Sequence, residues 1–149
     1  MAEGRLATEH ADAPDSTGLL LWRVTNTWQA AQRAALKPHG LTHVQFVLLA
    51  SLVWLDTDET ITQRDLADHA GTDPMMTSQV LRALEAAGHV VRRPHPTDAR
   101  ARSLAATPAG VALANRAVVD VEAVDRAFFG RLGEGRADFT ALLATLSRR

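Results

Sequence analysis

The side chains best suited to a specific chemistry are five arginines in residues 82–102. They are Arg82, Arg92, Arg93, Arg100 and Arg102. Two acidic residues lie among them, so this stretch carries five positive and two negative charges, or +3, whereas the whole chain carries −1. A positive segment on a nearly neutral protein is expected where a surface contacts phosphates. The alternative is an ordinary hairpin with exposed charges.

Patterns for catalysis or metal binding are weak by comparison. The sequence has no G-x-S-x-G, Walker or H-E-x-x-H motif, so we expect no catalytic residue and no cofactor. His39 and His43 are four residues apart, but Pro38 and Gly40 place them across a boundary between loop and helix. A zinc site there is disfavoured because no further ligand is near, and we expect no metal. The absence of Cys excludes disulfides and thiol chemistry.

The residues before the arginines predict two short helices separated by a turn at Gly71. Thr62 is suited to cap the first helix, and Gly71 to end it in the left-handed region. Asp73 is suited to cap the second helix, with Pro74 in its first turn, where a missing N–H costs nothing. We expect this second helix to end at Gly88.

The second helix has two faces when its residues are placed at 100° intervals. The inward face contains Thr77, Val80, Leu81 and Leu84, and the opposite face contains Met75, Ser78, Gln79, Arg82 and Ala86. Gln is suited to read adenine, Arg guanine or phosphate, and Met a thymine methyl group. The opposite face is therefore a candidate for reading bases, and the alternative is a solvated helix surface.

A strand, a turn and a second strand are predicted next. Residues 89–93 suit a strand, residues 94–99 a turn, because prolines interrupt a ladder, and residues 100–105 a return strand. Helix, turn, helix, strand, basic turn and strand form the order of a winged helix-turn-helix, which inserts its second helix into the major groove. We expect Asp98 to fix the turn by pairing with a neighbouring Arg, while Arg100 projects into the minor groove.

The remaining chain predicts one domain, residues 16–149, preceded by a polar, acidic and flexible arm. We expect helices over residues 18–36, 44–55, 108–129 and 136–147. The predicted fold class is mainly α with a small β-wing. No apolar run reaches the length of a membrane span, and the N-terminus lacks the features of a signal peptide, which is compatible with a cytoplasmic protein.

Several motifs in residues 66–110 resemble the MarR family of bacterial transcriptional regulators. They read LAxxxG, LExxGHVVR, PxDxR and TxxG. The matching residues are Leu66, Ala67, Leu84, Glu85, Gly88, Arg92, Pro96, Asp98, Arg100, Thr107 and Gly110. This stretch is about a third of the chain. Ala106 departs from the family, which usually has Leu there; the change removes packing under the wing but touches no DNA-facing position.

The resemblance implies a homodimeric repressor of a pseudo-palindromic DNA site, released by a small and often aromatic molecule. The DNA-binding lobe would be residues 42–107, and residues 16–37 and 108–149 would interlock between two subunits. Three alternatives remain: a monomeric helical bundle, a winged-helix module that binds a ligand or protein without DNA, and a small enzyme. The missing catalytic motifs disfavour the last of these.

These arguments assign three groups of site residues. The predicted DNA-binding residues are Met75, Thr77, Ser78, Gln79, Arg82, Arg93, His95, Arg100 and Arg102. The predicted wing-stabilising residues are Arg92 and Asp98. The predicted ligand-binding residues are Trp22, Trp28, His43 and Phe46, for which the alternative, shared with Trp54, is packing in the core or at the dimer interface.

Overall fold

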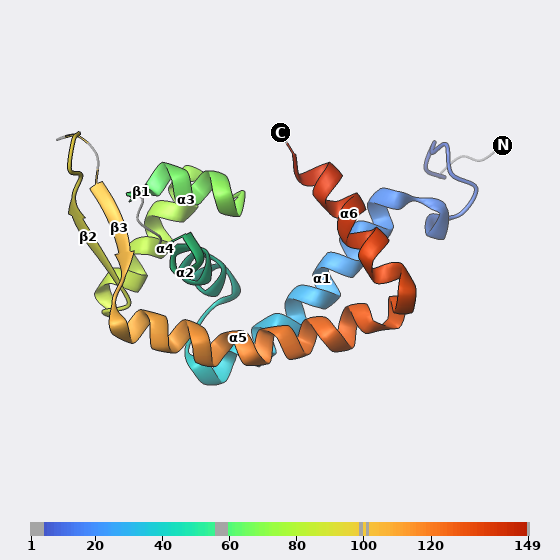
Figure 1. Ribbon diagram of the computed structural model, residues 1–149. Helices are drawn as coiled ribbons and strands as arrows, with labels where there is room; N and C mark the ends of the chain where they lie inside the picture. Colours follow the sequence, from blue (N-terminus) through green and yellow to red (C-terminus); the bar gives the residue numbers. More distant parts are fainter. Residues whose placement is uncertain (1–4, 56–59, 99, 101, 149) are drawn as a thin grey trace.

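The computed structural model describes residues 5–55, 60–98, 100 and 102–148. In Figure 1 a lobe containing the small sheet lies on one side, and an arm containing both described ends of the chain lies on the other. The helices are α1 (Thr17–Leu36), α2 (His43–Leu55), α3 (Gln63–Ala70), α4 (Pro74–Ala86), α5 (Pro108–Phe129) and α6 (Arg136–Ser147). The 3-10 helices are η1 (Ala13–Asp15), η2 (Lys37–His39) and η3 (Gly130–Gly135). The strands are β1 (Ile61–Thr62), β2 (Val90–Pro94) and β3 (Arg102–Ala106).

The core of the lobe is built around α2. Leu48, Leu49 and Leu52 on this helix are completely buried, and they pack with Leu81 and Leu84 of α4 and other apolar side chains in one cluster. Nearly every residue of α2 is apolar because α3, α4, α5 and β3 all contact it. Burial of this kind supplies the main stabilising free energy of a small lobe.

No single helix among the described residues is long and apolar enough to cross a membrane. Thr17–His39 and His43–Leu55 reach that length and composition only together, and the two segments are bent by 75° relative to each other.

The helix-turn-helix has the predicted caps. Thr62 and Asp65 form a reciprocal capping box at the start of α3, and Gly71 ends this helix with φ 69°. The Asp73 carboxylate accepts hydrogen bonds from the amides of Met75 and Met76, with Pro74 in the first turn of α4. These local bonds satisfy amides that a helix start leaves unpaired, so the sequence determines both helix starts directly.

The wing is an antiparallel sheet in the order β1-β3-β2. The prediction that the turn begins at Pro94 is wrong, because Pro94 is the last residue of β2 and pairs with Arg102. A proline can end a ladder, where its missing N–H removes no further bond. The return strand begins at Arg102, so Arg100 lies in the turn and not in the predicted strand.

The base of the wing is joined tightly to the start of α5. Thr107 donates its hydroxyl proton to the Gly88 carbonyl oxygen over 2.6 Å, and its amide donates to the His89 carbonyl oxygen over 3.0 Å. Gly110 lies against His89 so closely that a Cβ added there would be 2.1 Å from the same oxygen. The wing therefore depends on a residue without a side chain at position 110.

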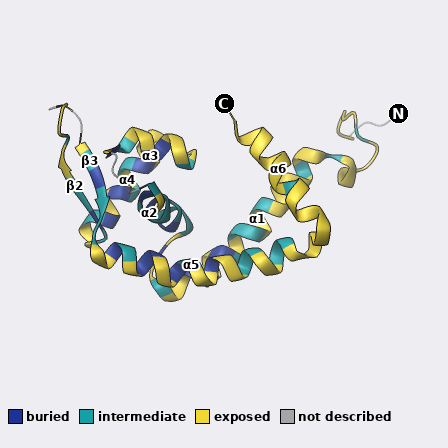
Figure 2. Ribbon diagram, in the orientation of Figure 1, coloured by how far each residue is buried: buried dark blue, intermediate teal, exposed yellow. Residues whose placement is uncertain are grey.

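The arm consists of α1, the distal part of α5, η3 and α6. On α5 the buried residues are Gly110, Leu113, Ala114, Ala117 and Val121. No described residue of α6 is buried, and Figure 2 shows this helix mostly in the colour of exposed residues. Within the predicted flexible segment, residues 13–15 form the short helix η1.

Candidate nucleic-acid interface

The outward face of α4 presents the predicted reading residues to solvent. Met75 has 73% of its surface exposed, Gln79 and Arg82 are exposed, and Ser78 is half-buried. The Arg82 guanidinium donates to the Ser78 hydroxyl over 3.1 Å, one helical turn away. This bond orients the guanidinium along the exposed face, where its remaining donors can meet a base edge or a phosphate.

Thr77 is a correction to the predicted DNA-binding set. Its side chain is completely buried, and its hydroxyl donates to the Asp73 carbonyl oxygen over 2.8 Å. The Thr77 hydroxyl oxygen also lies 2.6 Å from the Thr72 hydroxyl oxygen. Thr77 therefore fixes the turn against the first residues of α4, and its side chain is not available to DNA.

Arg92 joins three elements at the base of the wing. Its Nε donates to Glu85 of α4 over 2.7 Å, and its Nη1 donates to Gln63 of α3 over 3.0 Å. The Arg92 and Glu85 side chains are 27% and 29% exposed, so water screens this ion pair only in part. Arg92 is thus placed to hold β2 against both helices. Sequence reasoning did not find Gln63, because nothing in its local pattern indicates a long-range partner.

We expect Arg92→Ala to lower the free energy of unfolding by about 1–3 kcal/mol, since it leaves Glu85 and Gln63 without their partner. Glu85→Ala and the double variant complete a cycle in urea denaturation. A coupling of about 0.5 kcal/mol or more between the two positions is expected for a pair in contact. Additive effects would show that the bond does not stabilise the lobe.

The wing carries the other predicted cations. Arg93, Arg100 and Arg102 are all exposed. The Asp98 carboxylate accepts the backbone amide proton of Arg100 over 2.9 Å, so it fixes the turn through the backbone. The predicted pairing of Asp98 with an arginine side chain is therefore corrected, and the Arg100 guanidinium is not held by this carboxylate.

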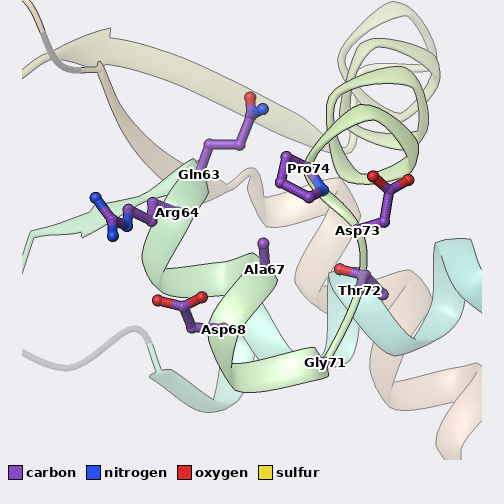
Figure 3. Close-up of a pocket in the computed structure, with 8 residues that line it drawn as sticks. All are labelled: Gln63, Arg64, Ala67, Asp68, Gly71, Thr72, Asp73 and Pro74. Atoms are coloured by element: carbon purple, nitrogen blue, oxygen red, sulfur yellow. The ribbon is translucent and has the colours of Figure 1, made fainter.

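A cavity of about 770 Å³ lies between α3 and the first turn of α4. Figure 3 shows it beside Ala67 and Gly71, two small residues that leave the space open. Arg64 contributes a positive charge to its lining, whereas Asp68 and Asp73 contribute negative charges. This cavity therefore does not extend the positive surface of the wing.

A second group of polar and aromatic side chains lies where α1, α2 and α5 meet. One carboxylate oxygen of Asp125 accepts bonds of 2.8 Å from both Trp28 and Gln32. The Trp28 and His43 rings are in edge-to-face contact, with centroids 5.1 Å apart. Burial lowers the pKa of His43, Arg33 lowers it further and Asp125 partly opposes them, so the ring is neutral at pH 7. We call these residues the interhelical cluster: Trp28, Gln32, His43 and Asp125.

The other two predicted ligand-binding residues do not belong to this group. Phe46 is only 6% exposed and packs in the hydrophobic core, because α2 turns it inward. Trp22 is 69% exposed. Trp28 lies six positions after Trp22, which is not a whole number of helical turns, so the two rings lie on different faces of α1. Trp54, 82% exposed, is likewise not packed in the core.

A smaller cavity of about 340 Å³ adjoins the start of α2. It is lined by Arg33, Lys37, Gly40, Leu41 and Thr42. Arg33 contributes to both sites, because its charge acts on His43 and its side chain lines this cavity. The structure thus brings one of the two cations of this cavity, Arg33, near the interhelical cluster, a juxtaposition that the spacing of α1 residues did not indicate.

His39 and His43, the two histidines considered as zinc ligands, each contact another side chain instead. His39 Nε2 lies 2.6 Å from Asp120 Oδ2 on α5, and His43 packs against Trp28. Among the residues that the structure describes, no three His, Asp or Glu side chains gather as a metal ligand set.

Comparison with known sequences agrees with this architecture. A model described as the MarR family matches residues 41–101. The HTH-type transcriptional regulator YdcH of Bacillus subtilis is 43% identical over 115 residues, covering 76% of this chain and 78% of the relative. The HTH-type transcriptional repressor Rv2887 of Mycobacterium tuberculosis is 38% identical over 121 residues, covering 81% and 84%.

Solved structures extend the similarity over nearly the whole chain. CouR from Rhodococcus jostii RHA1, bound to p-coumaroyl-CoA, superposes with a TM-score of 0.82 at 28% identity, covering 93% of this chain and 96% of that one. Rv2887 in complex with DNA superposes with a TM-score of 0.68 at 34% identity, covering 89% and 98%. Rv2887 has also been solved in complex with salicylic acid. With its winged helix-turn-helix, its paired terminal helices and these relatives, the chain belongs to the MarR family of transcriptional regulators.

Proposed function

We propose that this protein is a homodimeric transcriptional repressor that binds a pseudo-palindromic DNA site and is released by a small organic anion. The observation that carries the proposal is the exposed face of α4, with Gln79 and Arg82, on the same lobe as a wing with three exposed arginines. Residues 42–107 form the DNA-binding lobe, and residues 16–37 and 108–149 form the dimer arm. The repressor assignment follows Rv2887, and a regulator of this kind works in the cytoplasm and is not an enzyme.

The proposed dimer rests on apolar side chains that one chain leaves uncovered. Leu142, Leu143 and Leu146 of α6 are 64%, 39% and 77% exposed. Leu20 and Leu21 of α1 are 42% and 51% exposed on the same arm. Exposed leucines on two adjoining helices mark a protein interface, and a second copy supplies a complementary surface through two-fold symmetry.

Light scattering of the purified protein is expected to give about twice the chain mass of 16.1 kDa. Leu142→Glu combined with Leu146→Glu should shift the protein toward the monomer, because it places charges in the apolar contact. A monomer at micromolar concentration in the unmodified protein would contradict both the dimer and the two-half-site arrangement.

DNA binding is tested by selecting duplexes from a random pool with the unmodified protein. The selected sequences should contain two related half-sites, with centres one or more helical turns apart. Affinity should fall linearly on a plot of log affinity against log salt, because arginines that contact phosphates release counterions. Failure to enrich any sequence would support a winged-helix module without DNA binding.

The proposed effector binds in the cavity of about 340 Å³ beside the interhelical cluster. The anionic group would enter the cavity lined by Arg33 and Lys37, and the aromatic part would pack toward the Trp28 and His43 rings, which contact each other at the start of α2. The neutral His43 ring cannot attract an anion, so the attraction is left to these two cations. Salicylic acid in Rv2887 and p-coumaroyl-CoA in CouR, each an aromatic compound with an anionic part, support this class of ligand.

Aromatic carboxylates and phenols, screened for release of a selected duplex, are expected to include a releasing compound. Arg33→Ala should weaken its binding roughly tenfold through loss of a charge-assisted hydrogen bond. Arg148→Ala removes a distant exposed charge and serves as the control. A peroxide arm is included, and since the chain has no Cys, release by peroxide alone would contradict the ligand proposal.

A further inference from the structure

The wing turn has an unusual acceptor in the imidazole of His95. Its Nδ1 accepts the backbone amide proton of Asp98 over 3.0 Å and that of Thr97 over 3.2 Å. The ring is half-buried although it lies in a turn of exposed residues. A side-chain atom that accepts from amides two and three residues ahead closes a turn in the way that an Asn or Asp side chain does.

These bonds determine which ring nitrogen carries the proton. A nitrogen that accepts from two amides must be unprotonated, so the neutral ring holds its proton on Nε2. No hydrogen bond among the described residues uses Nε2. His95 was predicted to contact DNA, and only its Nε2–H is available for that contact, as a donor to phosphate.

The His95 ring also helps to position the backbone of Arg100, through Asp98. Its acceptor fixes the Asp98 amide, and the Asp98 carboxylate in turn accepts the Arg100 amide proton over 2.9 Å. The two bonds are consecutive along the turn: the His95 ring holds the backbone of Asp98, and the Asp98 carboxylate holds the backbone of Arg100. Loss of the first bond frees the residue that makes the second.

The charged groups around His95 come from α3 and from the turn itself. On α3, hydrogen bonds from Thr62 lower the pKa of the Asp65 carboxyl most, and charge on His95 and on Arg64 lowers it further, so Asp65 is close enough to attract a charged ring. Asp98 is the acidic residue of the turn. A protonated ring therefore has a carboxylate on α3 as an alternative partner, at the moment when its Nδ1 can no longer accept from the turn.

We propose that His95 is a positioning residue of the wing: its unprotonated Nδ1 holds the turn in the shape that presents Arg100 to DNA, and protonation of the ring releases the turn. This proposal rests on the proposed DNA-binding function. It makes operator affinity fall as the solution is acidified, although protonation adds a positive charge that by itself would favour DNA.

The test compares the unmodified protein with two variants on a duplex that the unmodified protein has selected. Both variants lack the Nε2–H, so they differ from each other in the acceptor. In His95→Asn the side-chain oxygen occupies the place of Nδ1 and carries no charge at any pH tested. In His95→Ala the acceptor is lost, and affinity should be roughly fivefold lower than that of His95→Asn at every pH. Thermal melting should be similar for all three, because the turn is exposed.

The pH profile separates positioning from a merely structural role. On acidification from about pH 8 to about pH 5, the unmodified protein should lose affinity until it matches His95→Ala. His95→Asn retains the other five histidines and should show only their contribution. The proposal is overturned if the unmodified protein and His95→Asn have the same profile, or if acid strengthens binding of the unmodified protein alone.

A measurement on the free protein distinguishes failure of this proposal from failure of DNA binding. Nuclear magnetic resonance should show the Nε2–H form of His95 at neutral pH. The amide signals of Thr97 and Asp98 should move on acidification in the unmodified protein and stay in place in His95→Asn. If no duplex is selected, the proposed function fails while these spectra still decide the wing geometry; a protonated Nδ1 at neutral pH would exclude the positioning role.

Discussion

Gly110→Ala is expected to lower the free energy of unfolding by about 3 kcal/mol or more, the largest stability effect of any single change considered. The added Cβ would lie 2.1 Å from the His89 carbonyl oxygen. That oxygen belongs to the backbone and accepts the Thr107 amide proton, so it cannot move away without breaking the join between wing and α5. The midpoint temperature of thermal unfolding should fall by roughly 10 °C for a chain of this size.

Gly130→Ala is the matched control. Gly130 lies at the other end of α5 with φ −58°, and a Cβ added there meets no atom within 4 Å. This variant should be neutral or more stable by about 0.5–1 kcal/mol, because Ala loses less conformational freedom on folding. Equal destabilisation by both substitutions would contradict the role of close contact at position 110.

Arg82→Ala is expected to reduce discrimination at one base pair in each half-site by roughly 1–3 kcal/mol, while other positions keep their preferences. The reason is that Arg82 lies on the exposed face of α4, oriented by Ser78, where it can form two bonds with a guanine edge. Affinities for a set of single-base variants of the selected duplex measure the change.

Arg100→Ala is the contrasting variant, since Arg100 lies in the wing turn. Its loss should weaken binding to all sequences alike and reduce the salt slope by about one. Arg148→Ala, which removes an exposed charge from the arm, should change neither quantity. If Arg100→Ala alters base preference and Arg82→Ala does not, the recognition elements have been assigned in the wrong order.

Local signals determined most of the fold. The caps at Thr62 and Asp73 and the left-handed Gly71 act within four residues, so they could be recognised in the sequence and are confirmed. The boundary at Pro94 could not be predicted, because whether a proline ends a ladder or begins a turn depends on the partner strand. Gly110 was matched by family motif, but its reason, the close approach to His89, is a tertiary contact.

The candidate sites were predictable to a smaller extent. Helical periodicity identified the exposed face of α4, and the same periodicity placed Thr77 inward, against its assignment to the DNA-binding set. Periodicity could not relate Trp28 to Asp125, because 97 residues separate them and only the crossing of α1 and α5 brings them together. The role of His95 depends on the orientation of a ring, which residue type alone does not determine.

The continuity of α5 has a mechanical consequence. Its 22 residues form a rod roughly 33 Å long that begins at the wing and ends beside η3. A rigid rod converts a tilt about one point into a displacement of its end. The interhelical cluster contacts this rod at Val121 and Asp125, and the wing is attached at its start, roughly 20–25 Å away. A tilt of about 5° at the cluster would therefore move the wing by roughly 2 Å. In the proposed dimer, a small molecule bound beside the cluster would thus change the distance between the two recognition helices without touching either of them.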